Sequence, residues 1–558
     1  MKRPELLCPA GSAEALRAAV LGGADAVYFG ASRFNARMNA RNLEGDEIRR
    51  AVSFCHEKGV KAYLTLNTLL TDRQLPEALD LAAFLYDTGA DALIVADLGL
   101  ARILHQQLPD LPLHASTQAS GHSAGAAELF RGIGFSRMVC AREMDQENIR
   151  ELCRTSPLPI EMFIHGAICA CHSGQCLMSS LIGGRSGNRG ECAQPCRLPY
   201  NGAYPLSFKD LCLAGHIREI LSLGVASLKV EGRMKSPQYV YTVASAYRRL
   251  LDEERDATPR EVEQLRDAFS RSGFTDGYFT GRIGDAMLGV RREEDKDKSR
   301  AQRPDLRDLA PKRAPITLSR VPVSPVMPPL PDGVTLPSRT VYRFRTPDQI
   351  PRVLADELCY LPLFQHVPGV RGAVLPAVIF PSEEAAVLAR LKQAGRDGAT
   401  DLIVTNPGQL SLVRDLGFTL HGDFRLNVTN SFAALAFDGV EDFLVSPELN
   451  LAQIRDLRLP RTVFLYGRIP LMLLEKPVAA KSLSDRRGVS FPVRREGKRS
   501  LVYNAIPLYM ADRRAELARA GITSFHVLFT TETPEEVRAL AAAIRNGAPP
   551  KGAVRRVK

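Results

Sequence analysis

The first 235 residues alternate short apolar runs with longer amphipathic stretches, and this alternation restricts the folds open to the chain. Eight apolar runs occur, at residues 5–10, 25–30, 61–67, 91–96, 111–116, 136–141, 160–166 and 226–232. The stretches between them have helical spacing, and Ser12 is the expected N-cap of the first. Strands that alternate with helices form parallel sheets, so eight such units predict a TIM-like (β/α)8 barrel of the α/β class. A doubly wound open sheet is the alternative, but no GxGxxG motif follows the first run.

The length of 558 residues exceeds what one hydrophobic core usually organises, so at least two domains are expected. Changes in composition along the chain suggest where they begin and end. We expect a catalytic barrel over 1–235, a helical extension over 236–290, a charged, proline-rich linker over 291–338, a second unit over 339–546 and a basic tail over 547–558.

The second unit repeats the sequence pattern of the first. Four pairs of segments match in the same order: 401–418 with 91–108, 440–457 with 135–152, 459–470 with 158–169, and 504–527 with 202–230. Cys169 aligns with Pro470 in the third pair, and no cysteine follows Cys359. We therefore expect a degenerate, barrel-like copy, with the single active centre in the first unit.

A cysteine-rich segment is the strongest chemical signal, because five of the eleven cysteines lie within the 28 residues from 169 to 196. Without a secretory signal the chain has little use for disulfides, so clustered thiols indicate a metal or reactive chemistry. The candidate ligands are Cys169, Cys176, Cys192 and Cys196, separated by six, fifteen and three residues. We interpret Cys171 as a small buried side chain, because it follows Cys169 too closely for both to bind without strain.

Thiolates bind both zinc and the iron of iron–sulfur clusters. A structural four-cysteine zinc site normally uses two CxxC knuckles, and neither occurs here. The segment is also rich in glycine, which would let a long loop approach a cluster closely. The residues therefore favour a [4Fe–4S] cluster, with a zinc site and unmetallated thiols as the alternatives.

The chemistry of a (β/α)8 barrel lies at the carboxyl ends of its strands, so the first polar residues after each run are candidates. We expect catalytic, proton-transferring roles for His165, Glu143, Asp210 and Glu231. The expected substrate-binding residues are Asn67, Gln118, Arg142, Lys209 and Arg233, since arginine clamps carboxylate or phosphate groups. For any one of these residues, a loop cap or a structural salt bridge is the alternative.

Arginines also follow the second apolar run. Arg37 and Arg41, with Arg33 before them, recur every four residues and would align on one face if the segment were helical. We expect Arg37 and Arg41 to bind substrate, with a solvated surface as the alternative. The formal net charge of +11 and the pI of about 9.1 permit a polyanionic partner such as RNA.

Neither a signal peptide nor a membrane span is expected. The start of the chain has no apolar stretch long enough for a signal, and no run of about 18 apolar residues occurs. We expect a cytoplasmic protein.

Three segments resemble peptidase family U32, the collagenase-like peptidases: residues 5–30, 162–197 and 227–240. The resemblance covers about residues 1–290. The C-terminal half further resembles the longer, RNA-hydroxylating branch of that family. The resemblance implies an iron–sulfur enzyme that hydroxylates a ring carbon without molecular oxygen, with the cluster on Cys169, Cys176, Cys192 and Cys196.

The resemblance further implies carbon 5 of a pyrimidine in RNA as the target, 23S rRNA cytidine first and tRNA uridine as an alternative. It implies prephenate as a co-substrate and RNA and an electron donor as partners, and we expect no stable protein partner. The C-terminal copy would serve RNA docking or stability. A peptidase and a non-catalytic RNA-binding iron–sulfur protein are the remaining alternatives, although no GxSxG or HExxH motif is present.

Overall fold

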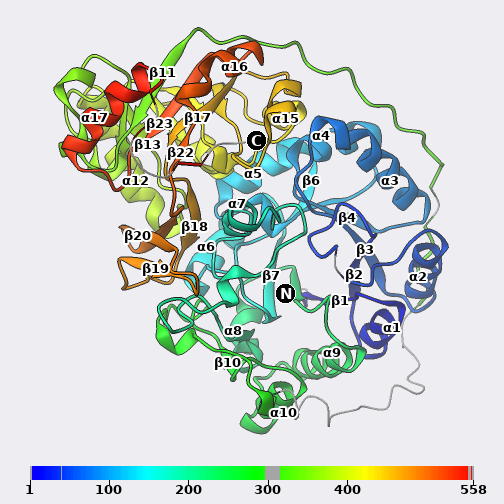
Figure 1. Ribbon diagram of the computed structural model, residues 1–558. Helices are drawn as coiled ribbons and strands as arrows, with labels where there is room; N and C mark the ends of the chain where they lie inside the picture. The colour runs from blue at the N-terminus through cyan, green and yellow to red at the C-terminus, as the bar shows by residue number, and fades with distance from the viewer. Residues whose placement is uncertain are drawn as a thin grey trace.

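Two barrels lie side by side in the computed structural model (Figure 1), the first coloured blue to green and the second yellow-green to red. The structure describes residues 3–38, 40–295, 314–318, 320–548, 550 and 554–555. Among these residues, every helix is too short or too polar to cross a lipid bilayer.

The first barrel closes from eight parallel strands. They are β1 (Glu5–Pro9), β2 (Ala26–Gly30), β3 (Lys61–Leu66), β4 (Ala92–Val95), β5 (Leu113–Ala115), β6 (Phe135–Val139), β7 (Ile160–Gly166) and β9 (Ser227–Val230). Strand β9 pairs with both β7 and β1, which closes the ring. Each strand overlaps one of the eight predicted apolar runs, so the predicted (β/α)8 fold is confirmed.

Helices cover the outside of this barrel. They are α1 (Ala13–Leu21), α2 (Asp46–Glu57), α3 (Leu75–Asp87), α4 (Leu98–Gln107), α5 (Ala124–Ile133), α6 (Gln146–Thr155), α8 (Ile217–Ser222), α9 (Pro237–Asp252) and α10 (Pro259–Ala268). Side-chain caps start them where the sequence provides one: the Ser12 hydroxyl accepts the Ala15 N–H, and the Asp145 carboxylate accepts the Asn148 N–H. A short strand, β8 (Asp210–Cys212), runs antiparallel to β7 and pairs with β10 (Phe274–Thr275).

The second barrel has the same topology. Its strands are β11 (Arg339–Arg343), β12 (Cys359–Pro362), β13 (Gly372–Val374), β14 (Asp401–Val404), β15 (Thr419–Gly422), β16 (Val440–Leu444), β17 (Arg461–Gly467) and β23 (Ser524–Leu528). Its helices are α12 (Glu384–Arg396), α13 (Leu410–Val413), α14 (Ser431–Ala434), α15 (Leu451–Asp456), α16 (Arg514–Arg519) and α17 (Pro534–Arg545). Strand β23 pairs with β17 and β11 and closes this ring as well.

The two barrels carry insertions at the same place. Strand β22 (Leu508–Tyr509) is antiparallel to β17, as β8 is to β7. The first barrel has the cysteine segment, residues 167–209, between β7 and β8. The second has a four-stranded antiparallel sheet between β17 and β22, made of β18 (Pro470–Leu474), β21 (Arg499–Tyr503), β20 (Ser490–Glu496) and β19 (Ser482–Ser484) in that order. The sequence repeat is therefore a structural repeat with different insertions.

The barrels meet in a reciprocal way. Helix α4, which follows β4, packs on α14, which follows β15; α5, which follows β5, packs on the turn and helix α13 that follow β14. Equivalent elements thus exchange partners, as in an isologous dimer interface. The approach is close: a Cβ added at Gly125 of α5 would lie 2.0 Å from the Ser411 hydroxyl and 2.5 Å from the Gly408 carbonyl.

A Gly125→Ala substitution is therefore expected to destabilise the protein by about 1–3 kcal/mol, because the added methyl group overpacks the barrel interface. Gly132 lies in the same helix with open space around it. Gly132→Ala is expected to stabilise by up to about 1 kcal/mol through helix propensity. Urea denaturation of both variants measures the difference, and equal effects would contradict the close approach.

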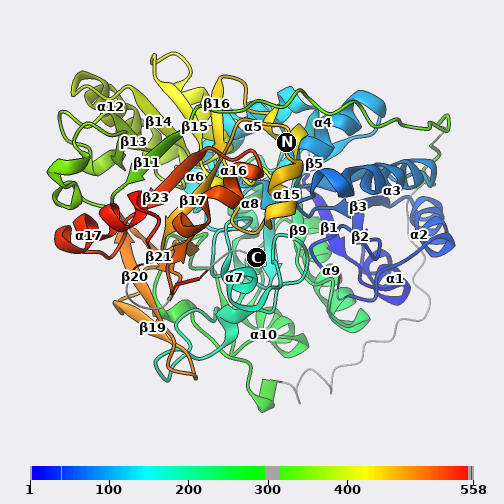
Figure 2. The same ribbon diagram turned by 45° about the horizontal axis from the view of Figure 1, so that its top comes forward.

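The described residues between 314 and 338 contain no helix or strand and run along the outside of the first barrel (Figures 1 and 2). The Ile316 N–H donates to the His56 carbonyl of α2, and Arg320 donates to the Ala90 carbonyl after α3. Val326 N–H then donates to Gln107 at the end of α4. The connection between barrels is thus tied to the first barrel's helices.

A buried ion network lies inside the second barrel. His421 of β15 contacts Asp401 of β14 through Nε2 at 3.2 Å and Asp442 of β16 through Nδ1 at 2.8 Å. Burial opposes the charged form, but the two carboxylates outweigh it and raise the pKa of His421 to about 9.

The raised pKa of His421 predicts that the folded protein loses stability at alkaline pH. An unfolded histidine titrates near 6.5, so the charged imidazole contributes fully below about pH 6.5, and its contribution disappears as the pH rises through 9. The shift corresponds to about 3 kcal/mol. Urea denaturation between pH 6 and pH 9.5 should show this loss in the wild type and not in His421→Gln. Parallel pH profiles for the two proteins would disprove the linkage.

Candidate functional site

The strands of the first barrel open, at their carboxyl ends, into a cavity of about 220 Å³. Strand-end residues form its walls, and the cysteine segment covers it. The lining includes Asn67 after β3, Gln118 after β5, Arg142 after β6, and Glu231 and Arg233 after β9. This is the end of a (β/α)8 barrel at which binding and catalytic residues gather.

All five thiols of the cysteine segment line this cavity, so chain folding brings together residues spread over 28 positions. Cys169 and Cys192 are exposed, whereas Cys176 and Cys196 are half-buried. Cys171 is buried, and its sulfur accepts the Leu473 N–H at 3.3 Å.

The donor set fits an iron–sulfur cluster. Burial and neighbouring thiols raise the pKa of Cys196 to about 12, and burial also raises that of Cys192. A hydrogen bond with Cys171 and burial hold the pKa of Cys176 well above its usual value. Four thiols at one cavity are the donor set that an iron–sulfur core takes, and each of them would have to lose its proton on binding. Among the described residues, no three His, Cys, Asp or Glu side chains converge tightly enough to hold a single metal ion.

The second half of the chain contacts the cysteine segment through backbone hydrogen bonds. His172 N–H donates to the Leu473 carbonyl at 3.0 Å, and Leu177 N–H donates to the Leu471 carbonyl at 2.8 Å, so the segment bonds to β18. The His172 imidazole contacts Glu475 at 3.1 Å and is fully buried. The candidate cluster site is therefore built by both barrels.

Two glycines let the segment approach the first barrel closely. Gly174 has φ +80°, and a Cβ there would lie 2.2 Å from the Gln118 carbonyl. Gly190 has φ +86°, and its Cβ would lie 2.3 Å from the Asn35 carbonyl. Both positions need a left-handed backbone and the absence of a side chain.

Two arginines share one carboxylate at the cavity wall. Arg37 and Arg142 each place a guanidinium nitrogen 3.3 Å from one oxygen of Glu231. Burial would raise the pKa of Glu231, but the arginines, Arg37 first, outweigh it and lower the pKa. Arg142 also lies 3.5 Å from the Cys169 sulfur. Two positive charges against one negative charge leave a net attraction for an anion, and we call these three residues the arginine clamp.

Below the clamp, charged residues are fixed by buried partners. Lys229 donates to Glu161 at 2.8 Å inside the barrel and lies 4.5 Å from the centre of the Tyr28 ring. Arg233 donates to the Thr65 hydroxyl and to two asparagines, and burial lowers its pKa to about 10. These contacts fix both side chains at the cavity wall, and the Nε atom of Arg233 remains buried without a hydrogen-bond partner.

Gln118 offers an acceptor to the cavity, because its Oε1 atom is buried and has no hydrogen-bond partner. The Thr117 hydroxyl beside it is likewise buried without a partner. Both residues line the cavity. Unpartnered buried polar atoms at a cavity wall are available to a bound molecule. Asn67, by contrast, accepts the Ala36 N–H and holds the loop after β2.

The structure places His165 and Glu143 away from the cavity. His165 packs between β7 and helix α9, where its Nδ1 lies 3.3 Å from the Tyr247 hydroxyl. Burial lowers its pKa to about 3, so the imidazole is neutral at physiological pH. Glu143 is buried 3.7 Å from His172, and burial raises its pKa. Both residues face structural neighbours rather than the cavity.

Asp210, Lys209 and Arg41 also lie elsewhere. Asp210 of β8 forms a buried ion pair with Arg271. Lys209 lines a separate cleft described below. Residues 33–38 form bends and a turn rather than a helix, so the arginines diverge. Arg37 reaches the cavity, whereas Arg41 is exposed, 3.9 Å from Glu14.

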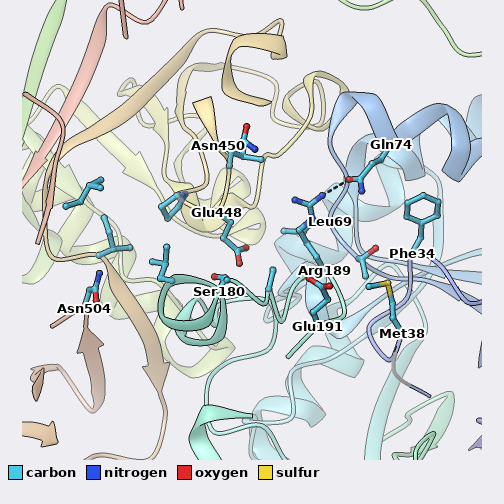
Figure 3. Close-up of a pocket in the computed structure, with 18 of the residues that line it drawn as sticks. Phe34, Met38, Leu69, Gln74, Ser180, Arg189, Glu191, Glu448, Asn450 and Asn504 are labelled. Carbon is cyan, nitrogen blue, oxygen red and sulfur yellow. Dashed lines mark hydrogen bonds between the residues drawn. The ribbon is translucent and has the colours of Figure 1, made fainter. Parts of the chain in front are cut away.

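A wider cleft of about 740 Å³ lies on the other side of the cysteine segment, between the two barrels (Figure 3). Phe34 and Met38 of the first barrel face Glu448 and Asn450 of the second, and Arg189 donates to Gln74 at 2.7 Å. The loop after β2 and residues 186–192 of the cysteine segment border both spaces: Met38 and Arg189 line the cleft, whereas Arg37 and Asn188 line the cavity.

Sequence reasoning missed several groups at the cavity, Thr117 and Lys229 among them. Arg197 and Arg271 come from the end of the cysteine segment and the loop before β10, and Met472 comes from the second barrel. None of these last three follows a predicted strand of the first barrel. No local sequence pattern indicates that Met472 of the second barrel's insertion lies at this cavity.

Comparison with known proteins gives a consistent relationship. The model of peptidase family U32 matches residues 11–288. The chain is 41% identical to 23S rRNA 5-hydroxycytidine C2501 synthase of Escherichia coli over 51% of this chain and 46% of that protein. It is 38% identical to tRNA hydroxylation protein P1 of Bacillus subtilis over 45% and 64% of the two chains. It is 33% identical to a collagenase of Porphyromonas gingivalis over 50% and 75%. The matches thus span about half to two thirds of the two RNA-related proteins.

Proposed function

Because this chain belongs to peptidase family U32, we propose that it is an iron–sulfur enzyme that hydroxylates carbon 5 of a pyrimidine in RNA without molecular oxygen. One observation carries the proposal: four cysteine thiols and the arginine clamp line a single cavity at the catalytic end of the first barrel. We propose 23S rRNA cytidine as the target, in line with the similarity to the E. coli synthase.

Cys169, Cys176, Cys192 and Cys196 would hold a [4Fe–4S] cluster in this cavity. When bound, the cluster would supply a redox-active centre beside the substrate. The external electron donor that we propose would set the oxidation state of the cluster before the reaction, since the hydroxylation itself releases electrons. The arginine clamp would orient an anionic co-substrate, because Arg37 and Arg142 carry one more charge than Glu231 neutralises. Prephenate, with two carboxylates, is the co-substrate we propose.

The other polar groups that line the cavity are suited to binding the pyrimidine ring of the RNA. Replacing C5–H by C5–OH oxidises the pyrimidine by two electrons. The co-substrate can balance this by transferring an oxygen atom, which reduces it by two electrons, or by accepting the two electrons while water supplies the oxygen and two protons are released. Gln118 and Thr117 present unpartnered polar atoms to the cavity and can hydrogen-bond a pyrimidine edge. Glu231, held as a carboxylate, can accept a proton during the reaction.

The Cys171–His172 pair is not arranged for peptide hydrolysis. Cys171 and His172 could form a nucleophile and base, but both are buried. The His172 ring contacts Glu475 and the Cys171 sulfur accepts a backbone N–H, so neither is presented to a peptide.

Nucleoside mass spectrometry tests the proposal. Ribosomal RNA from cells that lack the protein should lose 5-hydroxycytidine and regain it on expression of the wild-type chain. Cells grown without oxygen should still contain the product. If the deletion instead removes a hydroxyuridine from tRNA, the substrate is tRNA. An unchanged nucleoside profile would contradict the proposed hydroxylase activity.

A further inference from the structure

The sheet inserted in the second barrel contains the most basic stretch near the active cavity. Residues 481–499 contain seven Lys or Arg and two Asp or Glu, a formal charge of +5 in a chain whose total is +11. Most of this stretch forms the hairpin of β19 and β20. Figures 1 and 2 both show the hairpin at the edge of the molecule, away from α1 and α2.

The tip of the hairpin presents its cations to solvent. Arg486 and Arg487 are exposed, and Lys481 and Arg495 are exposed along the two strands. The nearest acid, Asp485, is occupied by its own turn, where its carboxylate accepts the N–H groups of Arg487 and Val489 at 2.8 and 2.9 Å. The guanidinium groups of Arg486 and Arg487 can therefore bind an anion without first breaking an ion pair with Asp485.

The hairpin is bonded to the segment that covers the cavity. Asn201 of the cysteine segment donates to the Ser482 carbonyl and accepts the Ser484 N–H, both at 2.9 Å, so the hairpin is bonded to that segment. Between them lies a cleft of about 680 Å³ lined by Tyr204, Lys209 and Arg292. The cleft adjoins the cavity, since Arg271 lines the cavity and the next residue, Ser272, lines the cleft.

We propose that the β19–β20 hairpin and this cleft bind the sugar–phosphate backbone of the RNA whose base enters the cavity, an inference that rests on the proposed function. Arginines bind phosphates bidentately, and the exposed ring of Tyr204 offers a stacking surface beside Lys209. The two equivalent insertions then have different functions. The insertion of the first barrel carries the cysteines, and that of the second barrel carries the RNA contacts.

The salt dependence of RNA binding tests this surface. The probe is an unstructured 20-nucleotide RNA containing cytidine and uridine, titrated by fluorescence anisotropy between about 50 and 300 mM salt against the full-length holoprotein. Losing two phosphate contacts with single-stranded RNA should lower the slope of log K against log salt by about 1.4. Arg486→Gln/Arg487→Gln should therefore weaken binding roughly 20-fold at 0.1 M salt.

Arg17→Gln/Arg50→Gln is the matched control, because it removes the same charge from exposed positions on α1 and α2. This variant should retain wild-type affinity and slope. Unchanged binding by the hairpin variant, or an equal loss in the control, overturns the docking surface. So does preferential binding of the hairpin to vesicles containing phosphatidylserine.

The docking surface and the proposed function fail separately. If the deletion strain lacks the hydroxylated nucleoside but the hairpin variant restores it and binds RNA fully, only the docking surface is disproved. If the nucleoside profile never changes, the proposed function fails whatever the hairpin does.

Discussion

Cys176→Ala is expected to abolish the iron–sulfur cluster, whereas Cys171→Ala leaves it in place. Both thiols line the same cavity of the same segment, so the pair is matched in position and chemistry. The two thiols share a hydrogen bond, but Cys171 is buried and its sulfur also accepts the Leu473 N–H of β18, whereas Cys176 is half-buried. Removing one of four ligands should leave a labile cluster or none.

Anaerobic purification measures this directly. The wild type and Cys171→Ala should contain about four irons per chain and absorb near roughly 400 nm, and Cys176→Ala should be nearly colourless. Denaturation midpoints of the iron-free proteins show whether the variants still fold. If Cys176→Ala retains iron and Cys171→Ala loses it, Cys171 is the ligand and Cys176 is not. One zinc per chain in the wild type would disprove the cluster.

Arg142→Gln should reduce hydroxylation on the order of 100-fold or more, because it removes a preorganised cation from a largely buried site. The substitution leaves Glu231 with Arg37 alone and removes the charge that we assign to the anionic co-substrate. The expected signature is a raised KM for the co-substrate together with a lowered kcat. Arg154→Gln on helix α6 is the control, since Arg154 is exposed and pairs only with Glu151.

Arg142 also contacts the Cys169 sulfur, so iron content must be measured in the same preparations. Full iron with low activity assigns the loss to the clamp. Wild-type activity in Arg142→Gln would show that the clamp does not bind the co-substrate, and a loss of iron would make Arg142 a positioning residue for Cys169.

Much of the fold could be predicted because buried strands produce a recognisable local pattern in the sequence. Strands inside a closed parallel barrel are buried on both faces, so each appears in the sequence as a short apolar run. The same reasoning predicted the repeat, since matching segments such as 401–418 and 91–108 form β14 and β4 and the helices after them. The cysteines of the segment were chosen from spacing, and they do share one cavity.

Side-chain direction could not be predicted in the same way. His165 was expected at the cavity because it ends β7, but the pairing of β7 with β9 shifts register between Phe163 and His165. Strand side chains alternate between faces, so an irregularity of this kind changes the side on which the next residue lies. Phe163 lines the cavity, whereas His165 packs under α9.

The sequence by itself determined that this chain forms a (β/α)8 barrel, a degenerate copy of it and one cysteine-rich segment, because periodicity, repeats and residue spacing are local properties. Only the tertiary structure decided which polar residues meet. Cys171 and Leu473, or Asn201 and Ser482, are about 300 or 280 positions apart and touch because the two barrels pack reciprocally. Contacts of that kind depend on the geometry of closed, packed units, which no local pattern encodes.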